Sequence, residues 1–462
     1  MGASPETRQE LNRVTHMDVI GPGVTALSVT VHVSDLVLER RTPLWWWAGF
    51  GLSLGLLGLF VVALGWLFIR GVGIWGIDWP VAWGFAIGNY VWWVGMASGG
   101  TLISALFFLT RSEWRSATSR IAETMTVFCV ACAGVMPVIH LGRWWYFYWL
   151  FPYPNTMALW PQFRSPLHWD FVAILVYVAG SMLFWYVGLL PDLATLRDRA
   201  RRRWQRVLYG LLALGWQGSS RHWRQFKILY GLFAALMAPL VCSIHSIVGL
   251  DFAGGLTPGW HETQFPPYFV FGAALSGFAV VLMLVIPLRR ALDLTGFITL
   301  RHIDVLARLM LTASLLLSYC YLIEVFMPFY RGEEHEITVV MSELGGYYAP
   351  WYWAKIILNG VVPQLLWIRP LRLNRPLLFL VALCVVVGMW IERYVIVVGG
   401  LHRNYTESSW FVFMPTFWDW ATLAGSVGLF LTGFFLALRF IPMVSMFELR
   451  ELLHKKRAEG GR

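Results

Sequence analysis

The sequence predicts an all-α integral membrane protein with about ten transmembrane helices. Hydrophobic residues make up 58% of the 462-residue chain, and only 13% of its residues are charged. Soluble globular domains carry about 25% charged residues, so one water-surrounded core cannot hide this much apolar surface. Apolar stretches of about 20 residues, long enough to cross a bilayer as a helix, recur along the chain. Both observations indicate that lipid surrounds much of the folded protein.

The basic residues predict how the chain is oriented. Of the 36 Lys and Arg residues, 28 lie in the termini and in every second connection between apolar stretches. Cytoplasmic loops carry an excess of Lys and Arg, so we expect this side, called the basic face below, to be cytoplasmic. An even number of spans then places both termini in the cytoplasm. Anionic lipid headgroups explain the net charge of +10, and nucleic acid is not expected as a partner.

The predicted segments follow in order along the chain. Residues 1–44 show no signal peptide and are expected to form a cytoplasmic tail, and residues 441–462 form a second cytoplasmic tail. Between them we predict a first helix with its periplasmic connection (45–80), a first four-helix bundle (81–250), a periplasmic loop (251–267), a second four-helix bundle (268–400) and a last helix (401–440). The ten predicted spans are 45–69, 81–109, 125–150, 169–190, 228–250, 268–288, 303–329, 351–368, 376–400 and 416–438.

Two parallel bundles are predicted because spans two to five and spans six to nine share orientation and length. Each set is also entered through a loop that contains proline, at Pro80 and at Pro266 and Pro267. Repeats of this kind are typical of duplicated membrane proteins. The two bundles flanked by single helices are therefore our expected architecture.

Ionisable residues near the periplasmic ends of the spans predict a binding site. A charged group at the centre of a membrane helix costs about 2.5–3.5 kcal/mol, so such residues usually face a protein interior and mark function. The candidates are His140, Arg143 and Trp144 on one face of the third span, Asp170 at the start of the fourth, and His245 and Asp251 at the end of the fifth.

Each candidate alone has an ordinary explanation. A membrane histidine is often a hydrogen-bonded core residue, a first-turn aspartate often caps a helix, and tryptophans often form an interfacial belt. Together, carboxylates and imidazoles in an aromatic setting predict a pocket for a flat ring with two hydroxyl groups, which is a quinol. Oxidising a quinol releases two protons, and these side chains are suited to accept them.

A second group of polar residues lies in the second predicted bundle. It comprises Glu324, Tyr319, Tyr321, Lys355, Glu392 and Arg393. These residues either form a proton-transfer route or are static ion pairs, and the sequence leaves both alternatives open. For Asp304 and Arg308, four residues apart near the basic face, static pairing is the better interpretation.

Other kinds of site are less well supported. Cys129 and Cys132 form a CxxC on an apolar span, where small packing residues are the usual explanation, and no metal site is predicted. Only His140 and His245 are deep enough to bind a heme, which is thin evidence for one. A transporter remains an alternative because of the buried charges and the glycine-rich run 95–100, although such runs usually serve helix packing.

Two long motifs resemble a known family. HLGRWWYFYWLFPYPNTMALWPQFRSPLHWD (140–170) and GLDFAGGLTPGWHETQFPPYFVFGAALSG (249–277) resemble the membrane subunit of bacterial alternative complex III, a member of the NrfD-like, polysulfide-reductase family. The resemblance implies a multi-pass protein of the bacterial inner membrane. It also implies a quinol site made by His140, Asp170 and Asp251, with menaquinone or ubiquinone as substrate.

The same resemblance implies partners. These are a periplasmic iron–sulfur protein, c-type cytochromes, a second NrfD-like membrane subunit and a terminal oxidase, with no heme or iron–sulfur cluster bound by this chain. The chain would then act in a respiratory quinol:cytochrome c oxidoreductase, with proton translocation as an open question. The alternative within the family is the quinone-linked membrane subunit of a molybdoenzyme or sulfur reductase.

Overall fold

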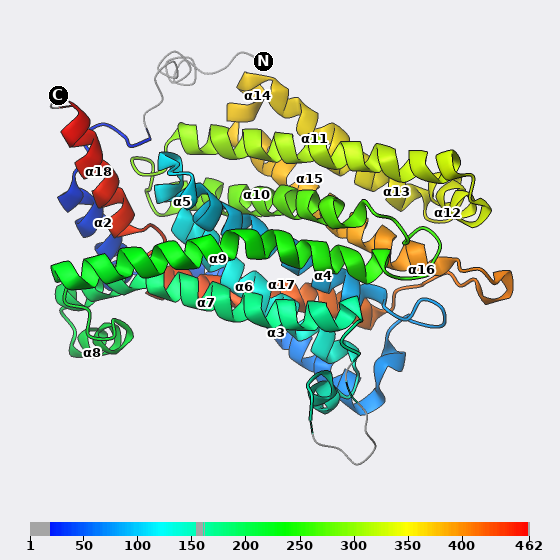
Figure 1. Ribbon diagram of the computed structural model, residues 1–462. Coiled ribbons are helices and arrows are strands. Elements are labelled where there is room, and N and C mark those ends of the chain that lie inside the picture. Colours follow the sequence, from blue (N-terminus) through cyan, green and yellow to red (C-terminus); the bar gives the residue numbers. More distant parts are fainter. Residues whose placement is uncertain (1–18, 154–159, 161, 461–462) are drawn as a thin grey trace.

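All regular structure in the described part of the chain is helical. The computed structural model describes residues 19–153, 160 and 162–460. Long helices run side by side along one common direction (Figure 1). Within the described residues, nine helices are long and apolar enough to cross a membrane. They are α3 (Leu44–Arg70), α4 (Gly84–Thr101) continued by η3 (Leu102–Leu106) and α5 (Phe107–Leu109), α6 (Ser119–His140), α7 (Pro166–Arg199), α9 (Ser220–Ala253), α10 (Phe265–Ala291), α11 (Leu300–Arg331), α15 (Arg375–Tyr394) continued by η8 (Val395–Gly399) and α16 (Gly400–His402), and α17 (Phe417–Phe440).

The predicted span 351–368 is not a continuous α-helix. It consists of α13 (Ala349–Ile356), a π-helical segment η6 (Ile357–Val361) and a 3-10 segment η7 (Val362–Trp367). Pro363 has no N–H to donate to the carbonyl of Asn359, four residues earlier. The hydroxyl of Ser314 on α11 donates to that carbonyl instead, at 2.5 Å. A neighbouring helix thus satisfies the backbone group that proline leaves unpaired.

The third predicted span, 125–150, has wrong boundaries. Helix α6 begins at Ser119 and ends at His140. Gly142 adopts a left-handed conformation, with φ of 68°, and the chain turns there. The aromatic run that follows forms a separate 3-10 helix, η5 (Trp144–Leu150). Residues 140–144 therefore do not share one helix face.

Shorter helices lie at the two ends of the long ones. Helices α2 and α18 lie together at one end, with the C-terminus, and α12 lies at the other (Figure 1). The predicted tails thus contain helices, although residues 1–18 and 461–462 lie outside the described residues. The remaining elements are α2 (Ala26–Leu38), η2 (Val72–Ile74), η4 (Glu113–Ala117), α8 (Arg203–Leu212), α12 (Glu334–Gly345), α14 (Arg369–Leu373), η9 (Glu407–Ser409) and α18 (Met446–Gly460).

Helix α4 lies at the centre of the packing. All but one of its residues are buried, and it contacts α6, α10 and α15. A Cβ atom on Gly99 would lie 2.2 Å from the Cα atom of Gly277, so only glycine lets α4 and α10 approach this closely. The glycine-rich run 95–100 therefore serves helix packing at Gly99.

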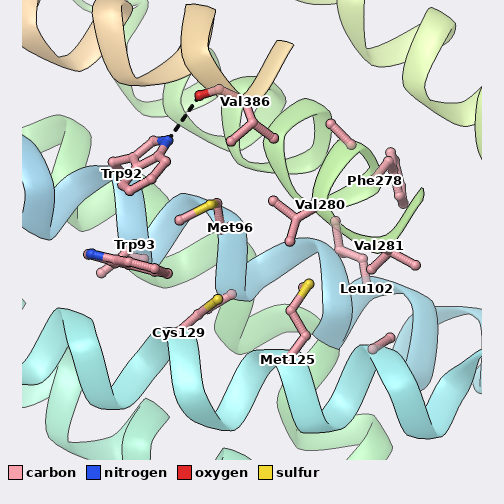
Figure 2. Close-up of a cluster of buried hydrophobic side chains, with 14 of the residues drawn as sticks. Trp92, Trp93, Met96, Leu102, Met125, Cys129, Phe278, Val280, Val281 and Val386 are labelled. Atoms are coloured by element: carbon pink, nitrogen blue, oxygen red, sulfur yellow. Dashed lines mark hydrogen bonds between the residues drawn. The ribbon is translucent and has the colours of Figure 1, made fainter. Parts of the chain in front are cut away.

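The core around α4 joins helices from both halves of the chain. Figure 2 shows Trp92 and Met96 between side chains of α6, α10 and α15, and the indole of Trp92 donates to the carbonyl of Val386 at 3.1 Å. Cys129 and Cys132 are free cysteines buried in this core, as expected for packing residues. Helix α10 contacts α4, α6 and α9 from the first half of the chain and α11 and α15 from the second half. The division into two four-helix bundles stays a prediction.

A buried ionic cluster anchors α18 at the basic face. Glu448 of α18 pairs with Arg115 and accepts hydrogen bonds from Ser119 at 3.0 Å and Tyr230 at 3.3 Å. Beside them, Arg120 pairs with Asp192 at 3.2 Å. Removing one member of a buried pair leaves an uncompensated charge, so these contacts hold the C-terminal helix firmly.

Candidate functional site

One pocket collects three of the predicted site residues. It has a volume of about 210 Å³ and lies between α4, α6, α7 and α9. Helix α6 places His140 in its wall, α7 places Asp170, and α9 places Asp251. All three come from helix ends that meet at the face opposite the basic one. His140 is the last residue of α6, Asp170 lies in the second turn of α7, and Asp251 lies in the last turn of α9.

Some polar atoms in this pocket form hydrogen bonds with one another, and others have no hydrogen-bond partner among the described residues. Tyr90 of α4 donates to one oxygen of Asp170 at 2.6 Å. The carboxyl group of Asp251 lies beside that of Asp170. Among the described residues, the second oxygen of Asp170, one oxygen of Asp251 and the Nδ1 atom of His140 are buried without a hydrogen-bond partner. Buried polar atoms are nearly always paired in folded proteins, so these three atoms are suited to meet a ligand.

The rest of the pocket is apolar. Its walls include Ile87 and Val91 of α4, Phe171 of α7 and Phe252 of α9. The ring of His140 stacks on Trp75, with 9° between the planes and 6.5 Å between the centroids. Such a site holds a flat ring by its faces and orients it by polar contacts at its edges.

The sequence did not identify Tyr90 as a residue of the pocket. It lies in the second predicted span, and only 3% of its surface is exposed. A tyrosine in a membrane helix is usually counted as an interfacial residue, and Tyr90 carries no charge to draw attention. Its position in the first half of the span, on the same side of the membrane as Asp170, is the signal that could have placed it in the pocket.

The structure does not place the other predicted residues in this pocket. Arg143 and Trp144 lie beyond the end of α6 and are exposed, because the chain turns at Gly142. His245 is buried deeper along α9, where its Nε2 atom is hydrogen-bonded to Ser98. His245 therefore has the environment of a hydrogen-bonded core histidine, which is the ordinary explanation for a histidine in a membrane helix.

The structure brings together the second group of polar residues predicted from the sequence, with the exception of Tyr319. The amino group of Lys355 lies 3.0 Å from the carboxylate of Glu324, and Arg393 lies 3.2 Å from Glu392. Tyr321 donates to Glu392. Tyr319 is 62% exposed and points away from this cluster, because it lies on another face of α11. The pair of Asp304 and Arg308 forms as expected at 2.7 Å.

This cluster continues toward the face opposite the basic one through further carboxyl groups. Asn359 donates to Tyr321 at 2.9 Å and connects it to Glu392. Outside the spanning helices, burial and the neighbouring Glu324 raise the pKa of Glu262 to about 7. Burial likewise raises the pKa of Glu343, on α12, to about 8. Carboxyl groups with such pKa values exchange protons near neutral pH.

In the part of the chain that the structure describes, no group of three His, Cys, Asp or Glu side chains could hold a metal ion. The titratable groups that line the pocket with Asp170 are carboxyl, imidazole and phenol groups. Groups of these kinds bind and move protons.

The chain is similar to known proteins over most of its length. The family described as "Polysulphide reductase, NrfD" matches residues 76–403. One relative, named as the membrane subunit of a putative dimethyl sulfoxide reductase from Halobacterium salinarum, is 27% identical over 375 residues, covering 76% of this chain and 79% of the relative. Another, named as a subunit of the selenate reductase from Mesobacillus selenatarsenatis, is 22% identical over 383 residues, covering 78% of this chain and 86% of the relative. Both relatives are named as subunits of reductases, so the narrower resemblance to alternative complex III stays a prediction.

Proposed function

This chain belongs to the polysulphide reductase, NrfD family, and we propose that it is the quinol-oxidising membrane subunit of an electron-transfer complex. The observation that carries the proposal is the convergence of three unpartnered polar atoms, on His140, Asp170 and Asp251, in one apolar-walled pocket. A quinol offers a flat ring for the walls and two hydroxyl groups for the polar atoms. Menaquinol and ubiquinol both have this form.

The proposed reaction removes two protons and two electrons from each quinol. Asp170 accepts the proton of one hydroxyl group while Tyr90 holds its carboxylate in place, and His140 accepts the proton of the other. Asp251 is only partly buried, so it passes protons from Asp170 toward water. Proton acceptors positioned in this way contribute about 10²–10⁴-fold to a rate. The two electrons leave for a partner iron–sulfur subunit docked at the same face.

Two kinds of assembly fit this role. The named relatives favour a reductase complex, because a reductase consumes electrons that its membrane subunit has to deliver. The motifs at 140–170 and 249–277 favour an alternative complex III, in which c-type cytochromes and an oxidase accept the electrons. The purified complex decides between them: molybdenum in a co-purifying subunit indicates the first, and multiheme cytochrome c indicates the second.

The orientation follows from the basic residues. We place the basic face in the cytoplasm of a bacterial inner membrane and the pocket near the periplasmic face. Protons from the quinol are then released to the periplasm. Labelling of single cysteines introduced near the pocket and in α18, from each side of sealed vesicles, tests this orientation.

Variants of the pocket test the proposed function. Asp170→Asn or His140→Ala is expected to leave the complex assembled and to lower quinol oxidation at least about 100-fold, because each variant loses a proton acceptor. The measurement is quinol-dependent acceptor reduction by the purified complex, with binding of a quinone analogue as a second readout. His168→Ala is the matched control, since His168 lies two residues from Asp170 and does not line the pocket. Wild-type turnover in both pocket variants would rule out this site.

A proton-transfer route through the second cluster is a separate proposal. We expect Glu324→Gln and Glu392→Gln to lower the number of protons moved per electron in reconstituted liposomes, because both carboxyl groups lie in the buried cluster with Lys355 and Tyr321. Tyr319→Phe is the control, since its side chain is exposed outside the cluster. Unchanged ratios in both glutamate variants would assign the cluster to static ion pairing.

A further inference from the structure

A second, larger cavity lies at the basic face. Its volume is about 650 Å³, and it is bordered by the ends of α3, α10 and α15. It lies at the basic ends of these helices, whereas the pocket with Asp170 lies between α4, α6, α7 and α9 at the opposite face. The cavity is therefore a separate site, and nothing about it depends on the proposed quinol chemistry.

The cavity is strongly basic. Arg289 and Arg290 at the end of α10 and Arg375 at the start of α15 line it, and none of the nine described lining residues is acidic. Arg289 is 8% exposed, and its Nε atom donates to the carbonyl of Ile298 at 2.6 Å, which fixes its guanidinium. The side chains of Arg290 and Arg375 are exposed, and neither forms an ion pair within the described residues. The two exposed guanidinium groups of Arg290 and Arg375, at a cavity with no acidic residue among its described lining, are suited to an anion with several oxygen atoms.

The remaining walls are apolar. Trp45 of α3, Pro287 of α10 and Phe379 of α15 line the cavity beside the arginines. A soluble anion such as phosphate would use the arginines and leave these walls empty. A molecule with an anionic head and an apolar chain uses both surfaces.

We propose that this cavity binds an anionic phospholipid, with its phosphate against Arg290 and Arg375 and an acyl chain along Trp45 and Phe379. Basic pockets between membrane helices on the cytoplasmic side are suited to such headgroups. The bound lipid connects α3 to α10 and α15. Helix α3 otherwise packs mainly on α17, so the lipid fills a position where protein contacts are few.

The test uses the purified protein in detergent, re-lipidated with either phosphatidylglycerol or phosphatidylcholine and examined by native mass spectrometry. The wild-type protein is expected to retain phosphatidylglycerol in preference to phosphatidylcholine. Each arginine near a lipid headgroup contributes about fivefold in affinity, so Arg290→Gln with Arg375→Gln should weaken phosphatidylglycerol binding about 25-fold. The matched control is Arg221→Gln with Arg224→Gln, which removes two exposed charges from the same face at the start of α9.

A second variant tests the volume of the cavity independently of its charge. Ala291→Phe fills the cavity without changing its charge and is expected to reduce retention of the lipid as well. Equal retention of the two lipids by the wild-type protein would overturn the proposal. Equal losses of phosphatidylglycerol binding in the Arg290 and Arg375 double variant and in the control double variant would also overturn it. The lipid would then be bound by the basic face in general and not by this cavity.

Discussion

The hydrogen bond from Tyr90 to Asp170 gives the sharpest prediction about the proposed quinol site. The two oxygens are 2.6 Å apart, and the side chains are 3% and 7% exposed. A buried hydrogen bond to a charged group contributes about 1.5–3 kcal/mol. If Asp170 needs this bond to stay positioned as a proton acceptor, Tyr90→Phe should lower kcat/KM for quinol by about 10-fold to 150-fold.

The assay is steady-state quinol oxidation by the purified complex, with kcat and KM determined separately. Tyr268→Phe is the matched control, because Tyr268 is fully buried and its hydroxyl has no hydrogen-bond partner among the described residues. It should therefore keep nearly wild-type activity.

A double-mutant cycle isolates the interaction between the two residues. In the Asp170→Asn background, Tyr90→Phe is expected to have little further effect, since the interaction with the carboxylate is already lost. Additive losses in the double variant would refute the positioning role of Tyr90. Unchanged kcat/KM in Tyr90→Phe alone would refute it as well.

Two further predictions concern stability. Glu448→Gln breaks the buried pair with Arg115 and should cost about 3–5 kcal/mol, seen as a lower Tm, whereas Glu451→Gln on the same helix breaks an exposed pair with Lys227 and should cost no more than about 1 kcal/mol. Equal shifts in Tm would show that α18 is not anchored by this pair. Burial raises the pKa of Glu262 from 4.5 to about 7. Between these two pH values the folded protein holds a proton that the unfolded chain releases. Burial of Glu262 therefore destabilises the fold increasingly as the pH rises from 4.5 to about 7. Glu262→Gln should therefore have a higher Tm than the wild-type protein at pH 8 and a nearly equal Tm at pH 4.5, and an unchanged difference between the two pH values would contradict this account.

The sequence predicted most of the spans because each depends on local composition. An apolar run of about 20 residues has few stable alternatives to a membrane helix, and nine of the ten predicted runs are long apolar helices in the described residues. The run 351–368 is helical, but it is divided into α-, π- and 3-10 segments, and the carbonyl of Asn359 accepts its hydrogen bond from Ser314 of another helix. A pattern of hydropathy carries no information about that partner.

The end of α6 shows the same limit within one span. Hydropathy continues past His140 into the aromatic run, so composition alone predicts a helix to residue 150. The left-handed conformation of Gly142 ends the helix ten residues earlier and moves Arg143 and Trp144 to the surface. Glycine permits that conformation without requiring it, and the surrounding structure decides which conformation is adopted.

For the pocket, the sequence by itself determined which residues are costly to bury. Charge in an apolar helix marked His140, Asp170 and Asp251 as candidates, and their positions along the spans placed them at one depth. Only the tertiary structure decided which way each side chain points. It brought these three residues and Tyr90 into one cavity and turned His245 toward Ser98. The physical reason is that depth follows from position along a helix, whereas direction follows from how each helix is rotated against its neighbours.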